Sequence, residues 1–109
     1  MKTTFNVRHM DKNSIVQDHF DERVLMLSKH LKRFKDDLTF LHATLEKNPH
    51  KNEFYSTLTL YLPSVALHSR EKDKDFGLAL SFAFSDIVRQ LEKHADKMGR
   101  EKRRKVREA

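Results

Sequence analysis

The segment 53–62 shows the clearest two-residue alternation of apolar and polar side chains in the chain. A period of two sends successive side chains to opposite faces of a β-strand, so we expect a strand with one apolar face. Other elements must cover that face, whereas the second face can remain in water. The side chains expected on the covered face are Phe54, Ser56, Leu58, Leu60 and Leu62.

Three further segments, 2–8, 38–47 and 65–68, carry a weaker form of the same alternation. They predict three more strands, each with one apolar face. The Asn and Pro residues of 48–52 predict a turn, and the charged stretch 70–75 predicts a loop. The apolar side chains of these strands are Phe5 and Val7; Leu41, Ala43 and Leu45; and Val65 and Leu67.

Two segments instead space their apolar residues by three or four, which predicts helices with one apolar stripe. The first runs from residue 14 to about 34 and can be capped by Asp11 or Asn13; the second can be capped by Asp75 and is expected to fray over 99–105. The first stripe consists of Val16, Phe20, Val24, Leu27, Leu31 and Phe34. The second consists of Phe76, Leu80, Phe84, Ile87, Leu91 and Met98.

The predicted order is therefore strand, helix, strand, strand, strand, helix, an α+β fold. The economical packing places both helices on one face of a four-stranded sheet and leaves the other face in water. Such a fold resembles the double-stranded-RNA-binding module with an extra leading strand. We expect one domain over 1–98, followed by a flexible basic tail over 99–109 that seeks nucleic acid or simply aids solubility.

The charge balance favours a polyanionic partner. The 109 residues include 22 Lys and Arg against 16 Asp and Glu, a net charge of +6. Acidic proteins and anionic membrane surfaces remain alternatives on charge alone. The chain has no Cys, which excludes disulfides and thiolate chemistry and suits a reducing cytoplasm. No stretch approaches the roughly 18 apolar residues that a membrane span requires.

The second helix carries the most informative charge pattern. Arg89, Lys93, Lys97 and Arg100 fall within a sector of about 80° opposite its apolar stripe. A row of cations on one exposed face suits the phosphates of a nucleic-acid backbone, because each contact releases counterions. The alternative is a solvated helix face with weak local ion pairs.

Basic residues also flank the apolar stripe of the first helix. Arg23, Lys29, His30 and Arg33 form this group, and two helices lying side by side would join it to the row on the second helix. Leu78 and Phe82 fall on the outer side of the second helix. They predict a partner contact or self-association, unless the core wraps further round that helix.

The remaining polar residues give no sign of catalysis or of a cofactor. The seven His are scattered singly, without the spacing of a zinc helix, and no phosphate loop or nucleophile elbow is present. We therefore expect no enzyme and no metal site. His42, His68, Tyr55 and Tyr61 are predicted on the open sheet face, either to stack on RNA or as ordinary strand residues.

The segment Asp86-Ile87-Val88-Arg89-Gln90-Leu91-Glu92-Lys93-His94 resembles the Lys-Leu-Glu-Arg-Gln-Leu-x-Lys signature of ribosome hibernation-promoting factors. This family is also called ribosome-associated inhibitor A or sigma-54 modulation protein. The segments 10–11, 19–24, 27–29 and 45–50 resemble its first helix and the strand and turn that follow.

The resemblance implies the same fold and a cytoplasmic protein that binds the decoding region of the small ribosomal subunit and its 16S ribosomal RNA. There it would block the mRNA and tRNA sites and inactivate translation in stress or stationary phase. The length and basic tail are similar to the short hibernation-promoting form, which implies ribosome modulation factor as a second partner and a role in ribosome dimers. The alternatives are a protein-interaction module and a general binder of structured RNA.

The resemblance places RNA contacts at Arg89 and Lys93 of the second helix and at Arg23 and Lys29 of the first. The chain departs from the family pattern at three places. The Gly that family loops often have near Pro63-Ser64 is missing here. Asp86 stands where the family usually has Lys, which removes one expected phosphate contact. Gly77 stands where Tyr is common, and Phe76 is expected to fill that space.

Overall fold

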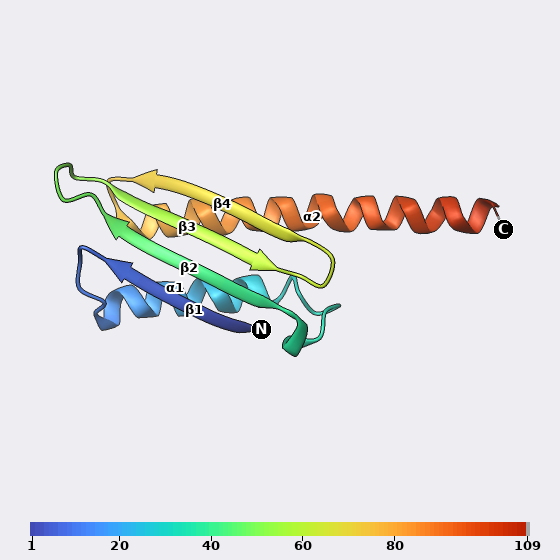
Figure 1. The fold of residues 1–109 in the computed structure, drawn as a ribbon, viewed down its shortest axis with the longest axis horizontal. Helices are drawn as coiled ribbons and strands as arrows, with labels where there is room; N and C mark the ends of the chain where they lie inside the picture. Colours follow the sequence, from blue (N-terminus) through green and yellow to red (C-terminus); the bar gives the residue numbers. More distant parts are fainter. Residues whose placement is uncertain (109) are drawn as a thin grey trace.

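The computed structural model describes the backbone of residues 1–108 and the side chains of residues 1–97. It confirms the predicted order of elements and the α+β class (Figure 1). The strands are β1 (Lys2–Arg8), β2 (Phe40–Lys47), β3 (Phe54–Tyr61) and β4 (Ala66–Asp73). The helices are α1 (Ser14–Ser28) and α2 (Phe76–Glu108), and a short 3-10 helix, η1, spans Asp36–Leu38.

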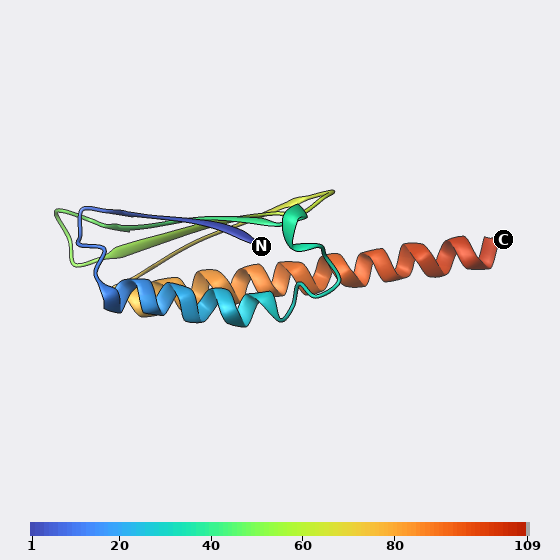
Figure 2. The ribbon, with the colours of Figure 1, turned by 90° about the horizontal axis from the view of Figure 1, so that it is seen from below.

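The four strands form one sheet in the order β1-β2-β3-β4. β1 pairs in parallel with β2, and the other neighbours are antiparallel. Figure 2 shows both helices below one face of this sheet, with the other face uncovered. The prediction that one sheet face remains open is therefore confirmed.

The prediction of a charged loop over 70–75 was wrong for most of its length. β4 continues to Asp73, which lies opposite Phe54 of β3. The stretch forms a strand because it pairs with β3, although it lacks apolar residues. Its polar side chains alternate between the two faces of the sheet as those of any strand do. Arg70 is exposed on the open face, whereas Ser69 is buried on the covered face.

Helix α1 begins as predicted but ends early. The Asn13 side chain caps it by accepting a hydrogen bond from the Val16 N–H at 3.0 Å. After Ser28 the chain turns through two tighter bonds, from the His30 N–H to the Leu27 carbonyl and from the Leu31 N–H to the Ser28 carbonyl. The expected extension to residue 34 was therefore wrong.

The core lies between the covered sheet face and the two helices. Phe20 of α1 stands at its centre: its ring stacks on Phe5 of β1 at 4.2 Å and meets Phe84 of α2 edge-on at 6.0 Å. Leu31, beyond the end of α1, is also buried. The strands contribute the buried side chains Leu41, Ala43, Leu45, Leu58, Leu60 and Leu67, and α2 contributes Leu80, Ala83, Ile87 and Leu91.

Helix α2 starts where predicted. The Asp75 carboxylate accepts a hydrogen bond from the Gly77 N–H at 2.8 Å. A Cβ at Gly77 would lie 3.2 Å from the His19 ring. Phe76 instead fills the neighbouring space, with edge contacts to His19 and Phe54.

The far half of α2 extends well past the sheet (Figure 1). Its backbone is helical to Glu108, which includes the segment predicted to fray. The domain boundary after residue 98 and the flexibility of the tail stay predictions. The side chains of the tail lie outside the described residues.

Candidate nucleic-acid interface

Helices α1 and α2 lie side by side (Figure 2). A groove of about 240 Å³ lies between them. Four residues from α1 and the turn after it line one wall: Arg23, Met26, Leu27 and His30. The other wall is formed by α2 and includes Ser81, Ser85 and Val88. The small serine side chains on α2 leave this space unfilled.

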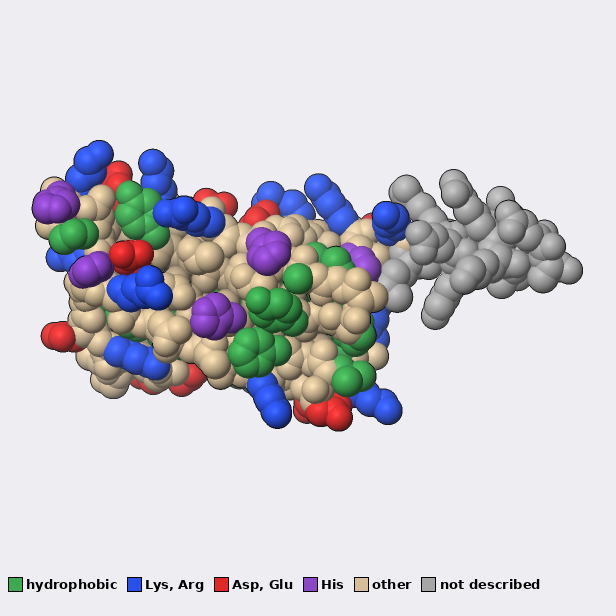
Figure 3. Space-filling view, viewed as in Figure 1, with side chains coloured by type: hydrophobic (Ala, Val, Ile, Leu, Met, Phe, Trp, Pro, Cys, Tyr) green, Lys and Arg blue, Asp and Glu red, His purple; other side chains and the backbone are tan. Residues whose placement is uncertain are grey.

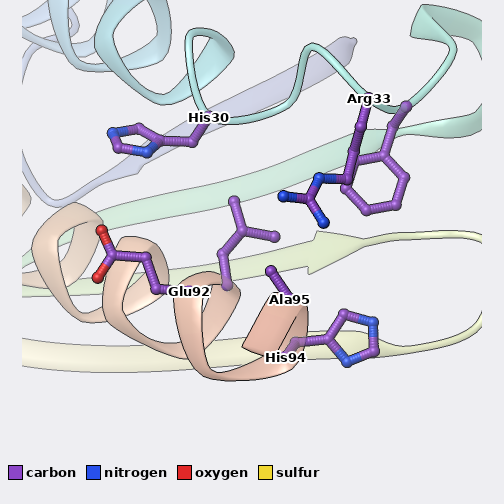
Figure 4. A pocket seen from close by; sticks show the side chains of 7 residues that line it. His30, Arg33, Glu92, His94 and Ala95 are labelled. Atoms are coloured by element: carbon purple, nitrogen blue, oxygen red, sulfur yellow. The ribbon is translucent and has the colours of Figure 1, made fainter. Parts of the chain in front are cut away.

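A second hollow, of about 90 Å³, follows the groove and shares His30 with it. Figure 4 shows Arg33 reaching from the loop after α1 toward α2, and Glu92 of α2 extending toward His30. His94 and Ala95 complete the α2 wall. Three of the basic residues predicted near the first helix, Arg23, His30 and Arg33, therefore line two adjoining hollows between α1 and α2.

Arg23 is the best-prepared anion ligand in this groove. Its Nε is buried without a hydrogen-bond partner among the described residues. Its Nη1 reaches only the Met26 sulfur, at 3.6 Å, which is a weak acceptor. A buried donor without a partner costs about 1–3 kcal/mol. A phosphate bound by the guanidinium would satisfy it once the Arg23 side chain turns to expose Nε.

The predicted cationic row lies along the exposed side of α2. Arg89, Lys93 and Lys97 are exposed, and the side chain of Arg100 lies outside the described residues. Arg89 follows Ser85 by one helical turn, so the row begins at the rim of the groove. Lys29 is exposed at the end of α1. The structure thus places Arg23 and Arg33 in the groove and the other described cations on its margins.

Asp86 partly neutralises the start of this row. Its carboxylate lies 3.9 Å from Nη1 of Arg89 and accepts a hydrogen bond from Nε2 of Gln90 at 2.9 Å. The same Gln90 nitrogen donates to the His68 carbonyl of β4 at 2.6 Å. An exposed ion pair of this kind contributes at most about 1 kcal/mol, so Arg89 is easily released to a phosphate.

Leu78 and Phe82 are exposed on the outer side of α2, as predicted, with 45% and 47% of their surface accessible. Met26 on α1 is similarly exposed, at 50%. These apolar side chains stand beside the cations on the helix side of the molecule. Their role as a partner contact stays a prediction.

Sequence reasoning missed the serines of the groove. Ser81 and Ser85 are small polar residues in a helix, and nothing in their spacing distinguishes them from solvated positions. Their importance comes only from the position of α1 opposite them. Among the described residues, no group of three or more His, Asp or Glu is placed to hold a metal ion, and no helix combines the length and hydrophobicity of a membrane span.

Comparison with known proteins adds to this geometry. A family model described as Sigma 54 modulation protein / S30EA ribosomal protein matches residues 3–99. The search of curated proteins gives no significant match.

Two solved structures share the fold. The N-terminal domain of Protein Y from Thermus thermophilus has a TM-score of 0.69 and 15% identity, over 86% of this chain and 99% of that chain. A ribosomal subunit interface protein from Coxiella burnetii has a TM-score of 0.66 and 15% identity, over 88% of this chain and 99% of that chain. At this identity the two likenesses establish the arrangement of strands and helices.

Proposed function

The chain belongs to the Sigma 54 modulation protein / S30EA ribosomal protein family, and from this premise we propose that it binds the small ribosomal subunit through its helix side. The helix side means the groove between α1 and α2 together with the exposed side of α2. One observation carries the proposal: the predicted cations for which side chains are described lie in or beside this groove.

The geometry of the row suits a polyphosphate backbone. Arg89, Lys93 and Lys97 follow each other at about 6 Å along the helix axis. Each side chain is long enough to adjust to a neighbouring phosphate, and each contact would release counterions. Arg23 adds a donor that is already desolvated and lacks a protein acceptor. The groove therefore supplies a fixed contact and the row supplies adaptable ones.

The proposed action is steric. The protein occupies the decoding region, contacts the 16S ribosomal RNA and excludes mRNA and tRNA, so translation stops in stress or stationary phase without catalysis. The family description, which names a ribosomal protein, and the name of one structural relative, a ribosomal subunit interface protein, support a ribosomal site. Cooperation with ribosome modulation factor in forming ribosome dimers belongs to the same proposal, as does a cytoplasmic location.

Co-sedimentation with purified small subunits tests the proposal. The double variant Arg89→Glu with Lys93→Glu should weaken binding by at least about 100-fold, because two attractive phosphate contacts become repulsive. Replacing both residues by Gln should reduce the slope of log K against log salt by about 1.5–2, the contribution of two contacts. Binding that is unchanged in both variants would contradict the proposal.

The matched control reverses two lysines far from the groove. Lys51 and Lys74 are exposed at the end of the sheet where β3 begins and β4 ends. Lys51→Glu with Lys74→Glu changes the net charge as much as the test variant. It leaves the groove and the row of cations intact, so most of the affinity should remain. Displacement of bound protein by mRNA and initiator tRNA then tests the decoding region itself.

A second candidate function is a protein-interaction module, which the exposure of Leu78 and Phe82 favours. A partner retained from nuclease-treated lysate should then be lost in the variant Leu78→Ser with Phe82→Ser. It should persist in the variant Arg89→Glu with Lys93→Glu. If the partner is instead lost in the variant Arg89→Glu with Lys93→Glu and persists in the variant Leu78→Ser with Phe82→Ser, residual RNA holds the partner.

A further inference from the structure

The sheet face opposite the helices, called here the open face, is organised in four rows that cross all strands. Two rows form its aromatic half. The first contains Lys2, Phe40, Tyr61 and Ala66, and the second contains Thr4, His42, Thr59 and His68. The other half carries more charge. Its rows are Asn6, Thr44, Thr57 and Arg70, then Arg8, Glu46, Tyr55 and Lys72.

The first row presents two aromatic rings to solvent. The centroids of Phe40 and Tyr61 lie 5.9 Å apart with the rings inclined by 42°, and 47% of Tyr61 is accessible. Figure 3 views this face and shows hydrophobic side chains grouped next to histidines, with Lys and Arg side chains around them. The rings stand on paired strands, so little conformational entropy remains to be lost when a flat ligand stacks on them.

The second row fixes two imidazole rings beside the first. The Thr4 hydroxyl lies 2.6 Å from Nδ1 of His42, and the Thr59 hydroxyl lies 3.2 Å from Nδ1 of His68. Both histidines are exposed. Each threonine therefore holds its neighbour through one ring nitrogen, while the ring itself stays accessible. The result is a group of four flat side chains over two adjacent rows.

The charge of the open face is strongly one-sided. Lys2, Arg8, Arg70 and Lys72 are its cations, and Glu46 is its one carboxylate. That carboxylate lies 3.5 Å from Nε2 of His9. This positively charged surface attracts anionic partners and repels cationic ones.

Tyr55 differs from the other aromatic residues of this face. The Arg70 guanidinium covers its ring at 5.4 Å, and its hydroxyl donates to Glu53 at 2.9 Å. Its ring is therefore already occupied. Bases can therefore stack only on the rings of the aromatic half, and the charged half can contact phosphates.

We propose that the open face binds an unpaired RNA strand, with bases stacked on Phe40 and Tyr61 and phosphates on Arg70 and Lys72. Exposed aromatic rings with neighbouring cations are the combination by which sheets hold single strands. A duplex hides its base faces and cannot use these rings. A protein partner fits less well, because the row of hydroxyl and imidazole groups interrupts any apolar contact area.

This inference uses no residue of the helix side, so it stands or falls separately from the proposed function. The probe is a fluorescently labelled, unstructured RNA of ten nucleotides. Its binding to the full chain is measured by fluorescence anisotropy. Phe40→Thr with Tyr61→Thr should weaken binding about 5-fold or more for each ring removed, the usual contribution of base stacking. Threonine is chosen because it favours strands, and circular dichroism checks the fold.

Ile15→Thr with Leu38→Thr is the matched control: it removes two exposed apolar side chains outside both surfaces, leaves the net charge unchanged and should keep the affinity for the short single strand. The helix variant, Arg89→Glu with Lys93→Glu, is measured as well, and removing the two rings should still weaken binding in that background. A blunt RNA duplex should bind the wild type and the Phe40 and Tyr61 double variant alike. Ultraviolet cross-linking of the wild type offers a second measurement that needs no variant, and its adducts should fall on the peptides containing residues 40 and 61.

Three results would overturn the inference. The first is the absence of single-strand binding by the wild type. The second is loss of that binding in the helix variant with retention in the sheet variant. The third is a cross-link from the open face to a ribosomal protein, with none to RNA, which would assign this face to a protein contact. Co-sedimentation of the sheet variant with small subunits, measured in parallel, reports on the proposed function independently.

Discussion

The helix side and the open face of this molecule hold their candidate functional side chains in different ways. On the helix side, the cations are the ends of long side chains, and Arg89 is paired with a carboxylate of its own helix at 3.9 Å. On the open face, rings and hydroxyl groups are locked across strands, as between Thr4 and His42 at 2.6 Å. The first surface adapts to its ligand, and the second presents a fixed shape.

This difference assigns different recognition to the two surfaces. Long-range attraction from mobile cations depends on salt and is largely independent of sequence. Fixed aromatic rings act only at contact and depend on whether bases are exposed. On the two proposals, the helix side would hold an RNA backbone and the open face would hold unpaired bases, and the following variants test that division.

The largest effect should come from Phe20, because the two surfaces share it. Its ring contacts Phe5 of the sheet and Phe84 of α2, so it joins the layers. Phe20→Ala should lower the free energy of unfolding by about 3–5 kcal/mol. Urea denaturation measures this change. The two proposed activities, binding to small subunits and to single-stranded RNA, should fall together, whereas Phe20→Leu should lose much less. Independent loss of one of them would show that the layers fold separately.

The layered fold was predictable because its covered faces follow simple periods. Leu58 and Leu60 had to share a strand face, and Leu80, Ile87 and Leu91 had to share a helix face. Strand β4 was only half predicted, since Arg70 to Asp73 show no apolar alternation. Their strand conformation depends on pairing with β3, which local sequence does not encode.

The candidate site was predictable to the extent that it follows from helix phase. Fixing the apolar stripe of α2 placed Arg89 and Lys93 on the exposed side, where they are found. The groove was not predictable, because it depends on the separation of α1 and α2. The contact between Thr4 and His42 was also out of reach, since it requires the register of two strands far apart in sequence.

Asp86 offers a smaller test that concerns the helix side alone. Asp86→Lys removes the carboxylate that holds Arg89 and adds a cation to the row, so affinity for small subunits should rise about 5-fold. Asp86→Asn should give part of this gain. The control is Asp37→Lys on η1, which changes net charge equally at an exposed site away from the helices. Equal gains from both lysine variants would attribute the effect to net charge.

The smallest effect should come from the hydroxyl that positions His68. Thr59→Val keeps the shape and strand preference of the side chain but removes the group that lies 3.2 Å from Nδ1 of His68. Affinity for the short single-stranded RNA should fall about 2- to 3-fold, within the range of one weak exposed hydrogen bond, while binding to small subunits stays unchanged. Thr57→Val is the matched control, because Thr57 lies one row away, opposite Arg70 and Thr44. If both valine variants weaken RNA binding equally, general loss of polarity explains the effect; if only Thr59→Val does, the orientation of the imidazole ring matters to the open face.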